Sequence, residues 1–148
     1  MLHSERPPEE LAQYTGFLLG FLGEKSRGRF IATLQPHGLH PRVFGMMNVL
    51  ATRPGITQQE LASLANVDPS SMVALLDEME SQGLAERHVD PVDRRRRSVH
   101  LTETGQLKLK AMRVDARIAL DEFLAPLSEK ERDTLQRLLR KLAGLDPA

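Results

Sequence analysis

The chain has 148 residues, with 20 lysines and arginines balanced by 20 aspartates and glutamates, and 41% of its residues are hydrophobic. This length and composition suit one compact domain with a modest core and exclude a disordered chain. No cysteine is present, which excludes disulfides, thiolate metal sites and cysteine-based redox sensing. The apolar stretch at 17–22 is too short to span a bilayer and follows an acidic segment, so we expect a cytoplasmic protein without membrane contact.

The zero net charge hides an uneven distribution along the chain. Residues 57–83 carry five acidic and no basic residues, whereas residues 84–102 carry five basic and three acidic ones. Basic charge is therefore local. A nucleic-acid partner is compatible with this pattern, because a concentrated basic patch is sufficient to attract phosphates.

Helical spacing of apolar residues dominates the first third of the chain. It predicts one long amphipathic helix over residues 9–34, weakened by several glycines. A break at 35–40 follows, and Pro41 then stands at the first turn of a second helix that ends before Arg53, Pro54 and Gly55.

Two short helices are predicted next, separated by a tight turn. Thr57 and Glu60 form a capping box that opens the first. Asp68 is the N-cap of the second, with Pro69 at its first position, and this helix runs to about residue 82. Its apolar spacing assigns one face to the core, consisting of Met72, Leu75, Leu76 and Met79.

A basic hairpin follows these helices. Residues 84–89 and 98–101 read as strands, residues 90–93 contain the proline and aspartates of a turn, and four consecutive arginines occupy 94–97 at and just past the tip. Four adjacent cations cannot be buried together, so they indicate a polyanionic partner. The alternative is a solvated charge run or a disordered basic tail.

Two short helices followed by a basic hairpin are the pattern of a winged helix-turn-helix, which makes the predicted fold mainly α with a two-stranded β-wing. The second helix of this motif presents its N-terminal residues to base edges in the major groove. Ser70 and Ser71 are then the best base-reading candidates, while Val73 and Ala74 could touch a thymine methyl group. Alternatively, the two serines only support the helix N-terminus.

The remaining helices indicate a second copy of the chain as partner. Apolar stripes run along residues 102–124 and along a last helix that Ser128 and Glu131 cap. These faces exceed what a small DNA-binding core can cover. We expect one domain, residues 1–148. Within it, residues 1–35 and 103–148 contribute the dimerisation helices of a homodimer, and residues 41–102 form the winged helix-turn-helix lobe that binds DNA. A larger monomeric helical core is the alternative.

These features together resemble the MarR family of transcriptional regulators over essentially the whole chain. The most specific part is DPVDRR at 90–95 followed by Leu101, Thr102 and Gly105; TQQELA at 57–62 and DPSS at 68–71 support it. The resemblance implies a homodimeric regulator, by default a repressor, that binds a pseudo-palindromic site on double-stranded DNA.

The resemblance also assigns roles to wing residues. In that family a wing aspartate orients a nearby arginine, and a wing arginine enters the minor groove. Asp93 would then orient Arg95 or a neighbour, and arginines 94–96 would reach DNA. Many relatives carry an arginine where this chain has Ala74, so specificity should depend on DNA shape, on the minor groove and on serine or glutamine contacts. The expected DNA-binding residues are Thr57, Gln58, Pro69, Ser70, Ser71, Val73, Ala74, Arg87, Asp93, Arg94, Arg95, Arg96 and Arg97.

Family members often release DNA when a small phenolic or aromatic anion binds between the dimer helices and the DNA-binding lobe. For each candidate residue, core packing or a solvated loop is the alternative role. His37 and His40 could also bind a metal, but two ligands alone do not make a site, so we expect no metal and no cofactor. The candidates for effector binding are Tyr14, Phe17, His37, His40, Phe44, Met47 and Arg113.

The sequence also bears on two other classes of function, an enzyme and a protein-binding module. An enzyme is not expected, because the sequence shows no nucleophile elbow, carboxylate pair, glycine-rich phosphate loop or complete metal set. A winged-helix module that binds proteins instead of DNA would use the acidic segment 57–83, and it is the alternative to DNA binding.

Overall fold

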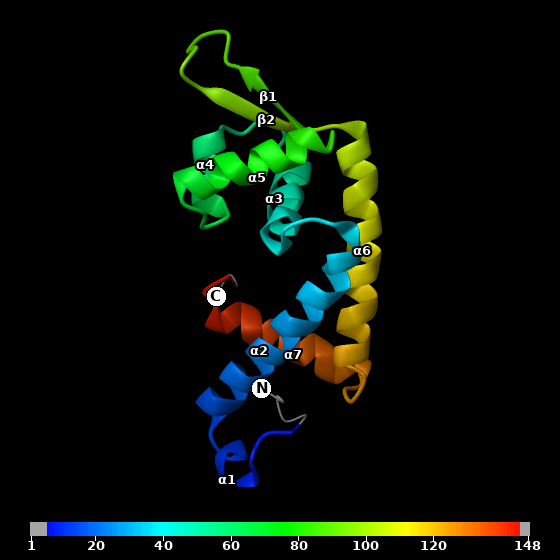
Figure 1. The fold of residues 1–148 in the computed structure, drawn as a ribbon. Coiled ribbons are helices and arrows are strands. Elements are labelled where there is room, and N and C mark those ends of the chain that lie inside the picture. The colour runs from blue at the N-terminus through cyan, green and yellow to red at the C-terminus, as the bar shows by residue number, and fades with distance from the viewer. Residues whose placement is uncertain (1–5, 146–148) are drawn as a thin grey trace. The chain divides into compact units, whose positions relative to one another are not determined.

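The computed structural model describes residues 6–145, which are mainly helical. They form two compact units: residues 31–116, and the residues up to 30 together with those from 117 onward. No helix within the described part of the chain has the length and hydropathy needed to cross a membrane. The elements, shown in Figure 1, are α1 (Glu9–Ala12), α2 (Thr15–Leu34), a 3₁₀ turn η1 (Gln35–His37), α3 (Pro41–Thr52), α4 (Gln58–Leu64), α5 (Pro69–Ser81), β1 (Ala85–Val89), β2 (Arg97–Leu101), α6 (Glu103–Phe123) and α7 (Glu129–Leu142).

The hydrophobic core of the unit 31–116 is rich in methionine. Its unbranched side chains fill irregular space between helices that meet at different angles. The face of α5 predicted from apolar spacing is confirmed, since Met72, Leu75, Leu76 and Met79 are all buried. The largest fully buried side chains of this unit are Leu34, Met46, Met47, Leu50, Leu61, Met72, Leu76, Met79, Leu109, Met112, Val43 and Val99.

The predicted hairpin is confirmed as the wing. β1 and β2 pair antiparallel, from Ala85 opposite Leu101 to Val89 opposite Arg97. The segment before α4 adds to the sheet, because Val99 N–H donates to Ile56 O at 2.9 Å and Gly55 N–H donates to Val99 O at 3.1 Å. The loop between the strands projects away from α4 and α5 (Figure 1). The winged helix-turn-helix fold class is therefore confirmed.

A close backbone approach joins the wing to α6. Thr102 Oγ1 donates to Gly83 O at 2.6 Å and accepts from Gly105 N–H at 3.0 Å, and Thr102 N–H donates to Leu84 O at 3.1 Å. A Cβ added to Gly105 would lie only 2.0 Å from Leu84 O. Glycine is therefore required where α6 begins.

The single helix expected over 9–34 is wrong in one detail, because the α-helix is interrupted at Gln13 and Tyr14, between α1 and α2. Tyr14 N–H donates to Leu11 O, and the Gln13 side chain donates to Glu10 O at 3.0 Å, so local bonds replace the helical ladder. Helical hydrogen bonding resumes where Leu18 N–H donates to Tyr14 O. These two short-range bonds compete with continuous helical hydrogen bonding, which is weakened because the flanking helix is rich in glycine.

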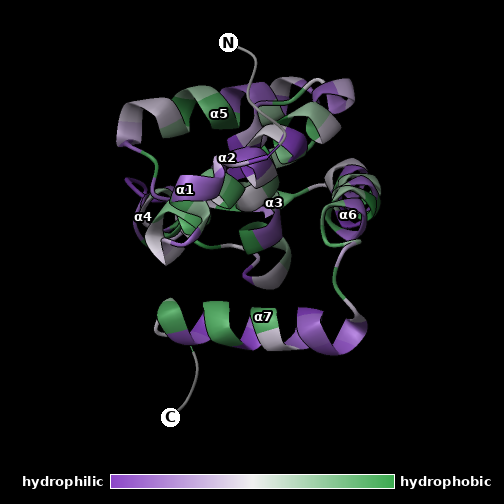
Figure 2. Ribbon diagram, turned by 90° about the horizontal axis from the view of Figure 1, so that it is seen from below, coloured by the Kyte–Doolittle hydropathy of each residue, from purple (hydrophilic) through white to green (hydrophobic). Residues whose placement is uncertain are grey.

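The second unit contains helices with uncovered apolar faces. The capping box of α7 is confirmed, since Ser128 N–H donates to Glu131 Oε2 at 2.8 Å and Glu131 N–H donates to Ser128 Oγ at 3.4 Å. Hydrophobic and hydrophilic residues alternate along α7 in Figure 2. None of its residues is buried, and Leu142 is 75% exposed. A leucine stripe of this kind is a surface that a partner would cover.

Candidate nucleic-acid interface

A groove lies among the first turns of α4 and α5 and the arginines of the wing. It has a volume of about 870 Å³ and lies wholly within the unit 31–116. The fold thereby places three separate stretches of the sequence around one concave surface. Its lining residues are Thr57, Gln58, Gln59, Glu60, Ala62, Ser63, Val67, Pro69, Met72, Arg95, Arg96 and Arg97.

The capping box fixes the entry of α4 into this groove. Thr57 Oγ1 accepts from Glu60 N–H at 3.1 Å and donates to Glu60 Oε2 at 2.8 Å, while Thr57 N–H donates to the same carboxylate at 2.9 Å. These bonds from Thr57 hold the pKa of Glu60 below its usual value. The Thr57 hydroxyl is thus bonded to its own helix, and Gln58 beside it lines the groove.

The entry of α5 combines a cap with a base-reading candidate. Asp68 Oδ1 accepts from Ser71 N–H at 2.9 Å and from Ser70 Oγ at 2.6 Å. The bond from the Ser70 hydroxyl is the main reason why the pKa of Asp68 is strongly lowered. Because the Ser70 hydroxyl donates its hydrogen bond to Asp68, this hydroxyl can only accept a further hydrogen bond. Ser70 therefore supports the start of α5 through Asp68 and is also exposed to solvent.

The rest of the first turns of α5 is partly open to solvent. Pro69, Val73 and Ala74 are exposed, and Ser71 is half-buried. α5 carries no basic residue, so its N-terminal turn presents apolar groups and hydroxyls where many helices of this kind present a cation.

The lowered pKa of Asp68 predicts an acid-sensitive helix start. The unfolded chain, with the ordinary Asp value of 3.8, binds a proton before the folded chain does, so this contribution to stability is present near neutral pH and is lost as the pH falls. We expect Asp68→Asn, which still caps the helix but does not titrate, to show a smaller loss of stability between about pH 5 and pH 2 than the natural chain. Urea unfolding midpoints across this range measure it, and equal losses in the two proteins would contradict it.

The wing loop is held by two aspartates. Asp90 Oδ1 accepts from the backbone N–H groups of Val92 at 2.7 Å and Asp93 at 3.1 Å, and these bonds lower its pKa. Asp90 N–H donates to Arg96 O at 3.1 Å, and Arg96 N–H donates to Asp93 O at 2.9 Å. The loop therefore has a defined turn geometry, although its side chains are exposed.

Asp93 contacts two of the wing arginines. Its Oδ1 accepts from Arg95 N–H at 3.0 Å, and its Oδ2 lies 3.8 Å from Arg96 Nε. Asp93 thus bonds the backbone of Arg95, whereas its ion pair with the guanidinium of Arg96 is long. Arg97 Nη1 lies 3.4 Å from Arg94 O, to which it donates. All four arginines remain exposed and so accessible to phosphates.

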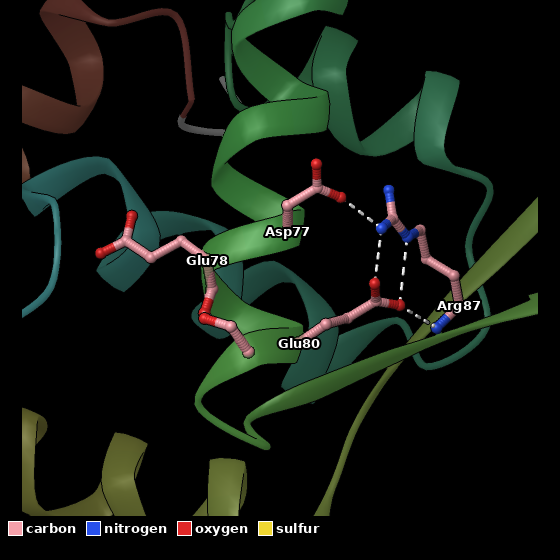
Figure 3. A network of polar contacts seen from close by, with 5 residues as sticks. Asp77, Glu78, Glu80 and Arg87 are labelled. Atoms are coloured by element: carbon pink, nitrogen blue, oxygen red, sulfur yellow. Dashed lines mark hydrogen bonds and ion pairs between the residues drawn. The ribbon is translucent and has the colours of Figure 1, made fainter.

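Arg87 differs from the other expected DNA contacts. Its guanidinium reaches Asp77 and Glu80 on α5, as Figure 3 shows. The only signal of this pairing in the sequence is two carboxylates three positions apart on a helix and an arginine on a nearby strand. The structure thus connects Arg87 to the predicted recognition helix.

The expected effector residues fall into two groups. In the unit 31–116, His37 Nε2 lies 2.7 Å from Asp115 Oδ2, and Arg113 Nε donates to Asn48 Oδ1 at 2.9 Å. Asn48 and Asp115 were missed by the sequence reasoning, in which they were simply polar residues on apolar helices. The Asn48 amide in turn donates to Phe44 O at 2.7 Å.

Other members of the expected effector set have separate roles. Met47 is fully buried in the core, and His40 Nδ1 caps α3 by accepting from Arg42 N–H at 3.2 Å. Tyr14 is exposed, and Phe17 stacks on Phe21 with ring centroids 6.2 Å apart, both in the unit that contains α7. Across residues 6–145, no three His, Cys, Asp or Glu side chains converge into a metal-binding group.

Comparison with known proteins gives consistent matches. Residues 37–96 match the model of the MarR family. A putative transcriptional regulatory protein for the hcr operon of Thauera aromatica is 38% identical over 109 residues, which span 74% of this chain and 66% of that protein. The HTH-type transcriptional repressor Rv2887 of Mycobacterium tuberculosis is 31% identical over 129 residues, spanning 87% of this chain and 93% of that repressor.

Solved structures extend the similarity to the fold. The transcriptional repressor CouR bound to a 23-mer DNA duplex matches with a TM-score of 0.82 and 28% identity, covering 95% of this chain and 99% of CouR. MarR of Escherichia coli matches with a TM-score of 0.78 and 25% identity, covering 87% of this chain and 96% of MarR.

Proposed function

Because this chain belongs to the MarR family of transcriptional regulators, we propose that it is a ligand-responsive homodimeric repressor of a pseudo-palindromic promoter site. The predicted class of function, a DNA-binding transcriptional regulator and not a protein-interaction module, is confirmed by this membership. The relatives are named as a transcriptional regulatory protein and a transcriptional repressor.

The groove between α4, α5 and the wing carries the proposal for DNA contact. Arg95, Arg96 and Arg97 line it together with the first turns of the two helices. With α5 in the major groove, the exposed arginines of the projecting loop reach the adjacent minor groove, where narrow A·T-rich DNA attracts guanidinium groups. The proposed contacts comprise Thr57, Gln58, Pro69, Ser70, Ser71, Val73 and Ala74 on the helices, and Asp93, Arg94, Arg95, Arg96 and Arg97 on the wing.

The exposed leucines of α7 support the proposal of a homodimer. Leu138, Leu139 and Leu142 are 45%, 42% and 75% exposed, and such a stripe is stabilised when a second apolar surface covers it. We assign residues 1–35 and 103–148 to dimerisation and residues 41–102 to DNA binding. A two-fold protein reads two half-sites and so doubles a weak readout.

Arg113 and its neighbours support the proposal of an anionic aromatic effector. Arg113 is exposed, and its Nε is held by Asn48. Its guanidinium retains further donors, which suit a carboxylate or phenolate. His37, paired with Asp115 two positions further along α6, adds a titratable group to the same part of the unit 31–116.

Selection of bound sequences from a random duplex pool tests the proposed function. We expect two inverted half-sites with centres about one helical turn, roughly 10 base pairs, apart. Sedimentation of the protein should give twice the mass of one chain. An asymmetric consensus or a monomeric mass would contradict the dimer, and absence of any enriched sequence would contradict promoter recognition.

The effector is tested separately on the selected duplex. Small aromatic carboxylates should release the fluorescently labelled duplex, whereas their uncharged methyl esters should not, because the guanidinium of Arg113 attracts an anion. Release by both members of each pair would contradict recognition of the negative charge.

A further inference from the structure

Arg87 lies on the face of the wing that turns toward the helices. Its partner on the opposite strand, Val99, is buried. Side chains two residues apart on a strand lie on the same face, so Arg87 shares its face with the buried Ala85. An apolar residue is usual at such a position. A guanidinium there needs partners, because its five N–H donors are otherwise removed from water.

Glu80 supplies most of these partners. Its Oε1 accepts from Arg87 N–H at 3.0 Å and from Arg87 Nε at 3.1 Å, and its Oε2 accepts from Arg87 Nη2. Asp77, one turn earlier on α5, accepts from the same Nη2. Three bonds to one carboxylate fix the direction of the arginine as well as its distance.

The bonds to Glu80 and Asp77 attach the wing to the recognition helix. Only 21% of the Arg87 side chain is exposed, and the side chains of Glu80 and Asp77 are 33% and 58% exposed. Partial burial shields the charges from salt and strengthens the contact relative to a surface ion pair. Backbone bonds attach β2 to the segment before α4, whereas the Arg87 side chain attaches β1 to α5.

We propose that Arg87 is a positioning residue, which holds the wing against α5 so that arginines 94–96 and the first turn of α5 engage one duplex together. Arg87 itself does not contact DNA. This inference rests on the proposed function, because it assumes that helix and wing contact the same site. Arg87 is thereby removed from the predicted set of DNA contacts.

Positioning predicts that the effect of Arg87 depends on the wing arginines. Arg87→Gln should weaken binding to the selected duplex about tenfold in the otherwise natural chain. In a protein that also carries Arg94→Ala, Arg95→Ala and Arg96→Ala, the same change should have almost no effect, because no arginines remain to be positioned. Fluorescence anisotropy at low salt measures all four proteins, since even weak complexes form there.

A direct phosphate contact would give a different result. Arg87→Gln would then weaken binding by the same factor in both backgrounds and would lower the salt dependence by about one counterion. Equal factors in the two backgrounds overturn the proposal while leaving the proposed function intact. If the natural chain binds no selected duplex at all, the proposed function fails instead.

Glu78 provides a matched control on the same helix. It carries the same charge as Glu80 but points away from Arg87 in Figure 3. Glu80→Gln should weaken binding about as much as Arg87→Gln does, whereas Glu78→Gln should not weaken it. Equal effects of the two glutamate variants would show that only the removed charge matters, which overturns the positioning role.

Folding is monitored by circular dichroism at the assay temperature. If Arg87→Gln does not fold, Arg87→Lys replaces it in the comparison, because one ammonium keeps the charge but cannot bond both carboxylates as the planar guanidinium does. A variant that is fully folded and still loses affinity only when the wing arginines are present supports positioning. A lowered unfolding temperature with unchanged affinity overturns it.

Discussion

Simultaneous replacement of Arg94, Arg95 and Arg96 by alanine should reduce affinity for the selected duplex by at least about a hundredfold, since each guanidinium contact contributes roughly 1 kcal/mol or more. The loss should be large because no lysine or arginine occurs between Ile56 and Leu84. The wing is therefore the main cationic surface available to phosphates. The slope of log affinity against log salt should fall by about three per bound protomer. Anisotropy titrations at several salt concentrations measure both quantities.

Replacement of the same three residues by lysine is the matched control. Lysine keeps the charge and therefore most of the salt dependence, but its compact ammonium suits a narrow minor groove less well than guanidinium does. We expect the lysine variant to bind random DNA nearly as well as the natural chain and to lose preference for the selected sequence. If the alanine variant binds the selected duplex with unchanged affinity and slope, the wing is not the DNA contact.

Gly105→Ala should destabilise the protein by about 3 kcal/mol or more, at the upper end of the range for overpacked sites. The added Cβ would lie 2.0 Å from Leu84 O and 2.9 Å from Leu84 C, both backbone atoms. Leu84 cannot move freely, because its N–H donates to Met79 O at 2.8 Å and its carbonyl accepts from Thr102 N–H. The junction of α5, β1 and α6 must therefore open. Thermal unfolding at a fixed protomer concentration should show a midpoint about 10 °C lower.

Gly45→Ala tests whether this effect is specific to the close approach. Gly45 lies in α3, where an added Cβ meets no atom within 4 Å. Alanine there should raise stability by about 0.5–1 kcal/mol, because it loses less backbone entropy than glycine on helix formation. A loss of stability at Gly45 comparable to that at Gly105 would contradict the steric explanation.

Local features of this fold were predictable from the sequence. Capping at Thr57, Asp68 and Ser128 depends on side chains within three residues of one another, so a short stretch of sequence contains the whole interaction. The buried face of α5 and the hairpin follow from periodicity for the same reason. The break at Gln13 is also local, but it depends on competition between bonds of similar strength, which a hydrophobic pattern does not describe.

Contacts between distant parts of the chain were not predictable in the same way. His37 and Asp115 are 78 positions apart, and Asn48 and Arg113 are 65 positions apart. The first pair depends on how η1 lies against α6, and the second on how α3 packs against α6. The partners of Arg87 likewise depend on the side of β1 that faces α5. The sequence predicts a basic region as a candidate site, but only the tertiary fold separates the exposed arginines of the loop from Arg87, whose side chain contacts α5.

The loop between β1 and β2 supplies its own shape. Its turn bonds come from Asp90 and Asp93 within the loop, and strand pairing ends at Val89 and Arg97 on either side. A segment that is folded by its own residues can be exchanged as a module without remodelling the helices beneath it. We therefore expect a change in this one short loop to alter the preference for a promoter while α5, the proposed recognition helix, stays the same.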